Sequence, residues 1–90
     1  MKKWRYIQSI KELMVGELYE MNVTDMRSLV PWFLLEDRER SANRPRNGSY
    51  VVYLGEELKE IREYRFLSSE GKMYCVYNTD FLHGLKRAEP

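Results

Sequence analysis

The chain of 90 residues contains one cysteine, Cys75, and one histidine, His83. A single cysteine excludes a disulfide within the chain and a zinc site built from several cysteines. Nucleophilic catalysis needs a nucleophile held by a base, and these two residues fall in different predicted elements. We therefore predict a non-enzymatic protein without a cofactor or metal. Cys75 should pack inside a β-strand, and His83 should lie at the end of a helical turn.

Several other signals are missing. The five glycines stand singly, so the sequence has no glycine-rich phosphate loop. The longest apolar run covers residues 29–35, whereas a transmembrane helix needs roughly 20 residues. The N-terminus is positively charged, but polar residues interrupt the next segment, and no signal peptide is predicted. We expect a cytoplasmic protein that does not bind membranes.

The chain also lacks an excess of charge of either sign. Fifteen Lys and Arg stand against 14 Asp and Glu, which gives a net charge of +1 and no global field that would attract nucleic acid. Hydrophobic residues make up 43% and aromatic residues 13% of the chain, too much for a disordered protein. These values predict one small folded domain over residues 1–90.

Alternation with a period of two residues recurs along the chain, and this pattern predicts a mainly β protein. Glycine, proline or charged residues separate the β-type runs. The predicted strands cover residues 16–22, 32–36, 49–54, 64–68, 72–77 and 85–88. The fifth follows the fourth through a short turn with Gly71, which predicts a tight hairpin.

Short helical turns and loops connect these strands. Ser9 and Glu12 have the spacing of a capping box, and residues 78–84 predict a single helical turn closed by Gly84. Residues 56–62 fit either a helical turn or the ends of two strands. Residues 37–48 combine charge, a proline and an Asn-Gly pair without a large apolar side chain, so we predict a long loop there.

This order of elements resembles the SH3-like small β-barrel, over residues 13–88. In that family a long arm separates the first two strands, a tight hairpin comes next, and a 3₁₀ turn precedes the last strand. The segments that carry the resemblance are residues 15–19, 51–55 and 79–84. The resemblance implies a five-stranded barrel, here with a short N-terminal extension. A five-stranded sheet packed on a terminal helix is the alternative architecture.

Two features suggest a contact surface. The run that begins with Trp32 and Phe33 is apolar at four consecutive positions, so one face of a sheet cannot bury all of it. It must be covered by the N-terminal segment, a second copy of the chain or a partner. In residues 49–54 either alternation leaves apolar side chains outside, and we place Tyr53 on the surface. The loop adds four arginines, which are Arg38, Arg40, Arg44 and Arg46.

These residues lead to three functional hypotheses. The first is a protein-binding module, because arginine and large aromatic residues are enriched at protein interfaces. The second is a nucleic-acid-binding barrel that uses the Arg38–Arg46 loop. The third is a protein that sequesters a small molecule, such as a nucleotide, between aromatic side chains of two copies. In size and composition the chain is similar to small bacteriophage-encoded proteins that bind and inhibit or redirect a host protein, which favours the first hypothesis.

Overall fold

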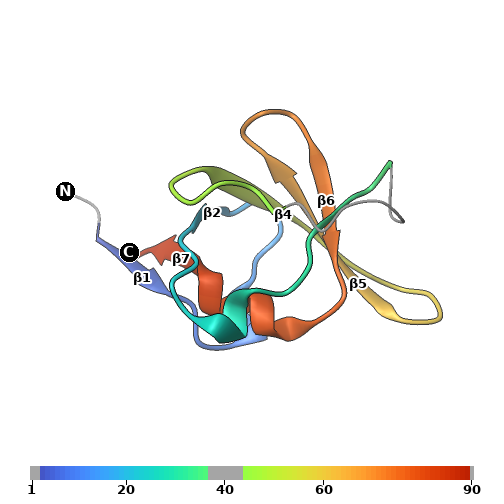
Figure 1. Ribbon diagram of the computed structural model, residues 1–90, viewed down its shortest axis with the longest axis horizontal. Coiled ribbons are helices and arrows are strands. Elements are labelled where there is room, and N and C mark those ends of the chain that lie inside the picture. Colours follow the sequence, from blue (N-terminus) through green and yellow to red (C-terminus); the bar gives the residue numbers. More distant parts are fainter. Residues whose placement is uncertain (1–2, 37–43, 90) are drawn as a thin grey trace.

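The computed structural model describes residues 3–36 and 44–89. Within these ranges the protein is mainly β, with seven strands in one antiparallel sheet (Figure 1). Three short 3₁₀ helices complete the fold. The strands are β1 (Trp4–Tyr6), β2 (Leu18–Met21), β3 (Phe33–Leu34), β4 (Tyr50–Leu58), β5 (Arg62–Ser68), β6 (Met73–Val76) and β7 (Leu85–Ala88), and the 3₁₀ helices are η1 (Ile10–Glu12), η2 (Met26–Ser28) and η3 (Thr79–Gly84).

The sheet has the strand order β1-β7-β2-β4-β5-β6-β3, and its two edge strands do not pair with each other. The expected closed barrel of five strands therefore needs correction, because the described sheet is open and has two further strands. One is β1, where Trp4 pairs with Ala88 of β7. The other is β3, where Phe33 pairs with Cys75 of β6. The N-terminal extension is thus part of the sheet.

The longest hairpin, β4–β5, settles the alternative for residues 56–62. Strand β4 continues to Leu58 and pairs with Arg62 at the start of β5, so no helical turn forms there. Strand β4 contains a bulge after Tyr53, where Gly55 has a φ of +116°. Such a positive φ favours glycine, which has no Cβ. The end of this hairpin projects beyond the rest of the sheet (Figure 1).

The predicted helical turns are present. Ser9 accepts a hydrogen bond from the Lys11 amide and forms a capping box with Glu12 at η1. Helix η3 covers Thr79–Gly84, with Asn78 rather than a later residue as its N-cap. Strand β3 is shorter than the predicted strand over residues 32–36, because Trp32 turns into the core before the strand begins.

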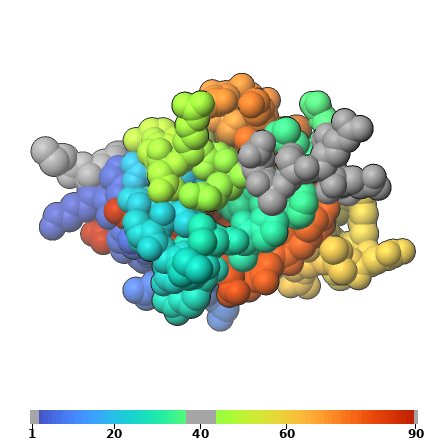
Figure 2. Space-filling model, in the orientation of Figure 1, coloured from blue at the N-terminus to red at the C-terminus, as the bar shows by residue number. Residues whose placement is uncertain are grey.

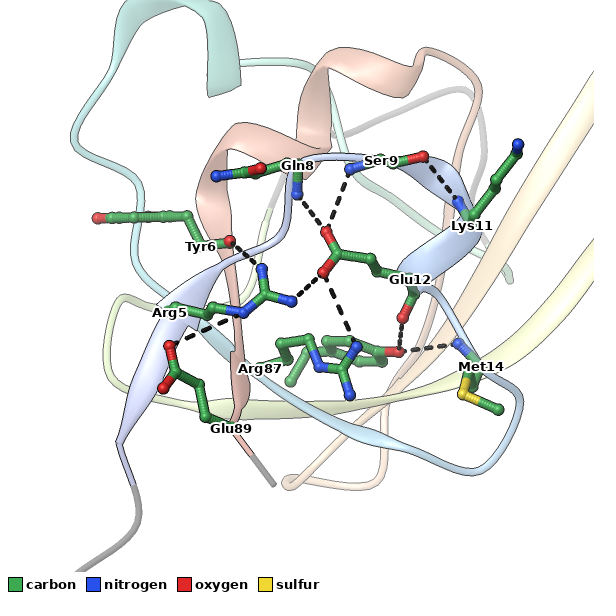
Figure 3. Close-up of polar contacts among 10 residues, drawn as sticks. Arg5, Tyr6, Gln8, Ser9, Lys11, Glu12, Met14, Arg87 and Glu89 are labelled. Carbon is green, nitrogen blue, oxygen red and sulfur yellow. Dashed lines mark hydrogen bonds and ion pairs between the residues drawn. The ribbon is translucent and has the colours of Figure 1, made fainter.

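Glu12 also fixes η1 to the edge of the sheet (Figure 3). Its carboxylate accepts hydrogen bonds from the backbone amides of Gln8 and Ser9 and from the guanidinium of Arg5 in β1. Arg87 of β7 lies 3.8 Å from the same carboxylate. The hydrogen bonds from Gln8, Arg5 and Ser9, led by that of Gln8, hold the pKa of Glu12 below its usual value. The N-terminal segment is therefore held by polar contacts as well as by strand pairing.

The core lies on one face of the sheet, called here the inner face. Helices η2 and η3 lie together against this side (Figure 1). Trp32 is at the centre, with ring centroids 4.9 Å from Phe66, 6.1 Å from Tyr74 and 5.9 Å from Phe81. Such tilted and edge-on ring contacts are the favoured arrangements of buried aromatic side chains. No described helix has the length and apolar composition that crossing a bilayer requires.

Candidate binding surface

The opposite, outer face of the sheet carries an unusual row of apolar side chains. In the central strands Leu18 pairs with Val52, Val52 with Leu67, and Leu67 with Met73. Directly paired residues point to the same face, so the four side chains form one line across β2, β4, β5 and β6. We call this line the outer apolar row. Leu18 is 44% exposed, Leu67 37% and Met73 38%.

Two aromatic residues extend this surface towards β1. The Trp4 and Tyr50 rings lie 5.6 Å apart between centroids. Tyr50 is two residues before Val52 and therefore shares its face of β4. An antiparallel sheet with one solvated face normally carries polar side chains on that face. The row and these two rings thus gather apolar side chains on one face, where Leu18, Tyr50, Leu67 and Met73 are exposed and Val52 and Trp4 are half-buried.

A polar cluster lies next to the row on β5 and β6. Arg65 Nε donates to Glu63 Oε2 at 2.7 Å, and the Tyr77 hydroxyl donates to Glu63 Oε1 at 3.2 Å. Burial raises the pKa of Tyr77 to about 12, so the hydroxyl keeps the proton that it donates. The Cys75 thiol lies 3.6 Å from the Tyr77 oxygen, and Cys75 has no exposed surface. This cluster holds β5 and β6 together and leaves the thiol closed to solvent.

A hollow lies at one end of the sheet. Arg44 and Arg46 there face the turn between β5 and β6, which contributes Lys72, and the space between them measures about 270 Å³. Figure 2 shows the two segments side by side, yellow-green next to orange. The other lining residues are Pro45, Ser49, Ser68, Ser69, Glu70 and Tyr74. We call this hollow the arginine cavity.

The structure separates the residues that the sequence suggested as a single contact surface. Trp32 is 1% exposed and Tyr53 is 5% exposed, so their placement on the surface is wrong. Tyr53 points inwards because its ring packs 5.2 Å from Phe66, which gives β4 the opposite alternation to the one we chose. Phe33 is half-buried beside Tyr77, with ring centroids 5.8 Å apart.

The structure describes two of the four arginines that were predicted to lie on the contact surface. Arg44 and Arg46 are exposed and line the arginine cavity. Arg38 and Arg40 lie outside the described residues. Sequence reasoning missed Lys72 as a neighbour of the arginines, because their proximity depends on how the β5–β6 turn folds back. It also missed the outer apolar row, although apolar residues at four consecutive positions from 51 to 54 indicated that some would face outwards.

Comparisons with protein-family models, with curated proteins and with solved structures find no match. Within residues 3–36 and 44–89 no three His, Cys, Asp or Glu side chains gather closely enough to hold a metal ion.

Proposed function

We propose that this protein is a non-enzymatic, SH3-like module that binds a partner protein through its outer apolar row. The SH3-like assignment is supported by five neighbouring strands, β7-β2-β4-β5-β6. Their first two in chain order, β2 and β4, are adjacent although a long arm separates them, β5 and β6 form a tight hairpin, and η3 precedes β7. Strands β1 and β3 are additions at the two edges.

The observation that carries the proposal is the pairing of Leu18, Val52, Leu67 and Met73 across four strands. When a partner covers such a patch, apolar surface is removed from water, which favours binding by about 25 cal/mol per Å² of buried apolar surface. Neighbouring β-strands already fix the backbone of these residues, so little ordering is needed when a partner binds. Trp4 and Tyr50 add the aromatic contact area that protein interfaces favour.

The charges at one end of the row indicate the chemistry of the partner. Lys72 directly precedes Met73, and Arg44 and Arg46 lie across the arginine cavity from it. Only Glu70 among the residues lining this cavity is acidic. The partner is therefore a protein whose apolar surface is bordered by acidic side chains, which complement these three cations. We propose a host protein in the cytoplasm, as expected for a bacteriophage-type inhibitor.

The other two hypotheses have less support among the described residues. A base-stacking surface needs exposed aromatic rings beside the cations, but Tyr74 in the arginine cavity is buried. A small-molecule site between two copies would need aromatic residues lining a shared pocket, whereas the buried aromatic rings pack on one another in a single core.

The test is affinity capture from a bacterial lysate with wild-type protein and two matched variants. Leu67→Ser with Met73→Ser removes the centre of the row, and Met26→Ser removes a highly exposed apolar side chain on η2, at the other face. A specific partner should be retained by wild type and Met26→Ser and lost by the double variant. Its purified form should then bind wild type with an affinity that falls as salt rises, because of the acidic border.

Two results would overturn the proposal. One is a partner that the double variant retains at wild-type affinity. The other is self-association through the row, seen by sedimentation as a wild-type dimer that Leu67→Ser with Met73→Ser converts to a monomer. Circular dichroism and thermal unfolding of each variant establish that it is folded before binding is compared.

A further inference from the structure

Among the described residues, the lining of the arginine cavity carries three cationic side chains and one carboxylate. Lys72 Nζ lies 3.9 Å from Glu70 Oε2. No ion pair joins Arg44 or Arg46 to any other residue in the described ranges, although both side chains line the same cavity. Three cations thus face one carboxylate, and two guanidinium groups are left to bind an anion from outside.

Neutral hydrogen-bond donors lie beside these cations. Ser68 Oγ accepts a hydrogen bond from the Lys72 amide at 3.2 Å, which leaves its own proton available to donate. Ser69 contributes a second hydroxyl to the lining. Tyr74 also lines the cavity, and because a phenol keeps its proton at neutral pH, its hydroxyl is a third donor. The cavity therefore combines fixed positive charge with several hydroxyl donors.

The lining of the cavity narrows the kind of ligand. Pockets for drug-sized molecules are mostly apolar, whereas the lining of this cavity is mostly charged and hydroxyl-bearing. A guanidinium presents parallel N–H donors that match two oxygens of a phosphate. A single tetrahedral oxyanion fits these properties better than a nucleobase or an apolar side chain.

We propose that the arginine cavity is an oxyanion site that binds a phosphate group, held by Arg44, Arg46 and Lys72 with hydroxyl donors from Ser68 and Ser69. This site uses the same three cations that border the outer apolar row, but it does not need the apolar side chains of the row, and its ligand can be bound by the isolated protein. The phosphate group can belong to a phosphorylated protein or to a nucleotide, because the recognised chemistry is the same.

The test is an NMR titration of the isolated full chain with inorganic phosphate, at constant ionic strength set with chloride. We expect saturable shifts of the amide signals of Ser68, Ser69 and Lys72. Arg44→Gln with Arg46→Gln should weaken binding about tenfold or more, because each lost charged hydrogen bond contributes over 1 kcal/mol. Lys11→Gln removes one exposed charge on η1 and should leave binding unchanged.

Shifts that do not saturate, or equal affinity in wild type and the double arginine variant, would overturn the site. Phosphoserine and a nucleoside 5′-monophosphate, each compared with its unphosphorylated form, identify the source of the phosphate. The tighter of the two phosphorylated ligands indicates whether a protein or a nucleotide is the natural one. Equal binding of the unphosphorylated forms would also contradict the proposal.

Discussion

Gly84, the last residue of η3, lies against Val23 so closely that a Cβ on Gly84 would be 2.7 Å from Val23 Cγ2. The same atom would be 3.2 Å from Ser28 Cβ at the end of η2. The φ of Gly84 is not positive, so the requirement is for space and not for an unusual backbone conformation. This contact is what allows η2 and η3 to pack together over the inner face.

Gly84→Ala should therefore destabilise the protein by about 1–3 kcal/mol, the usual cost of overpacking a core. Chemical denaturation of wild type and variant measures the free energy of unfolding. In a Val23→Ala background the same substitution should cost clearly less, because the clashing methyl group has been removed. Equal costs in both backgrounds would show that the Val23 contact is not responsible.

Trp32→Ala should lower the free energy of unfolding by about 3–5 kcal/mol, because it leaves a large cavity among Phe66, Tyr74 and Phe81. Leu67→Ala, on the outer face, should cost about 1 kcal/mol or less. Urea denaturation compares the two. A small effect at Trp32 would contradict its position at the centre of the core.

Glu12→Gln should cost about 1 kcal/mol at pH 7, since the carboxylate accepts hydrogen bonds from Gln8, Ser9 and Arg5. The folded-state pKa of Glu12 is below the ordinary value of 4.5 for this carboxyl group. The stabilisation from its charge is therefore fully present above that ordinary pKa and is lost as pH falls through the folded-state pKa.

Thermal unfolding of wild type and Glu12→Gln, followed from about pH 7 into the acid range below the ordinary pKa of the carboxyl group, measures this effect. The gap in melting temperature between wild type and Glu12→Gln should close on the acid side. Glu60→Gln, at the exposed turn of the β4–β5 hairpin, is the control, and its gap from wild type should be small throughout. A gap that stays constant for Glu12→Gln across the whole range would contradict the role of its charge.

The thiol of Cys75 should not react with Ellman's reagent in the folded protein, because it is fully buried between β5 and β3. It should react fully in denaturant. The rate under native conditions then reports how often β3 separates from β6, since Phe33 is the residue paired with Cys75. Immediate reaction of the native protein would show that this edge of the sheet is open.

Local patterns in the sequence were enough to predict many elements. The capping box of Ser9 and Glu12, the hairpin turned at Gly71 and the helical turn before β7 depend on neighbours within a few residues. The same patterns could not give the length of β4, because its bulge at Gly55 is maintained by pairing with β5. The addition of β1 depends on Trp4 meeting Ala88, residues at opposite ends of the chain.

The sequence by itself determined the β class, the short turns and the absence of a multi-cysteine site, since composition and close spacing govern these properties. Only the tertiary structure decided which alternation of β4 faces the core. Val51 and Tyr53 turn inwards because Phe66 and the neighbouring aromatic rings are there to pack on, and this choice places Val52 in the outer apolar row. The arginine cavity likewise requires Arg44, Arg46 and Lys72 to meet across a turn, which no short-range pattern encodes.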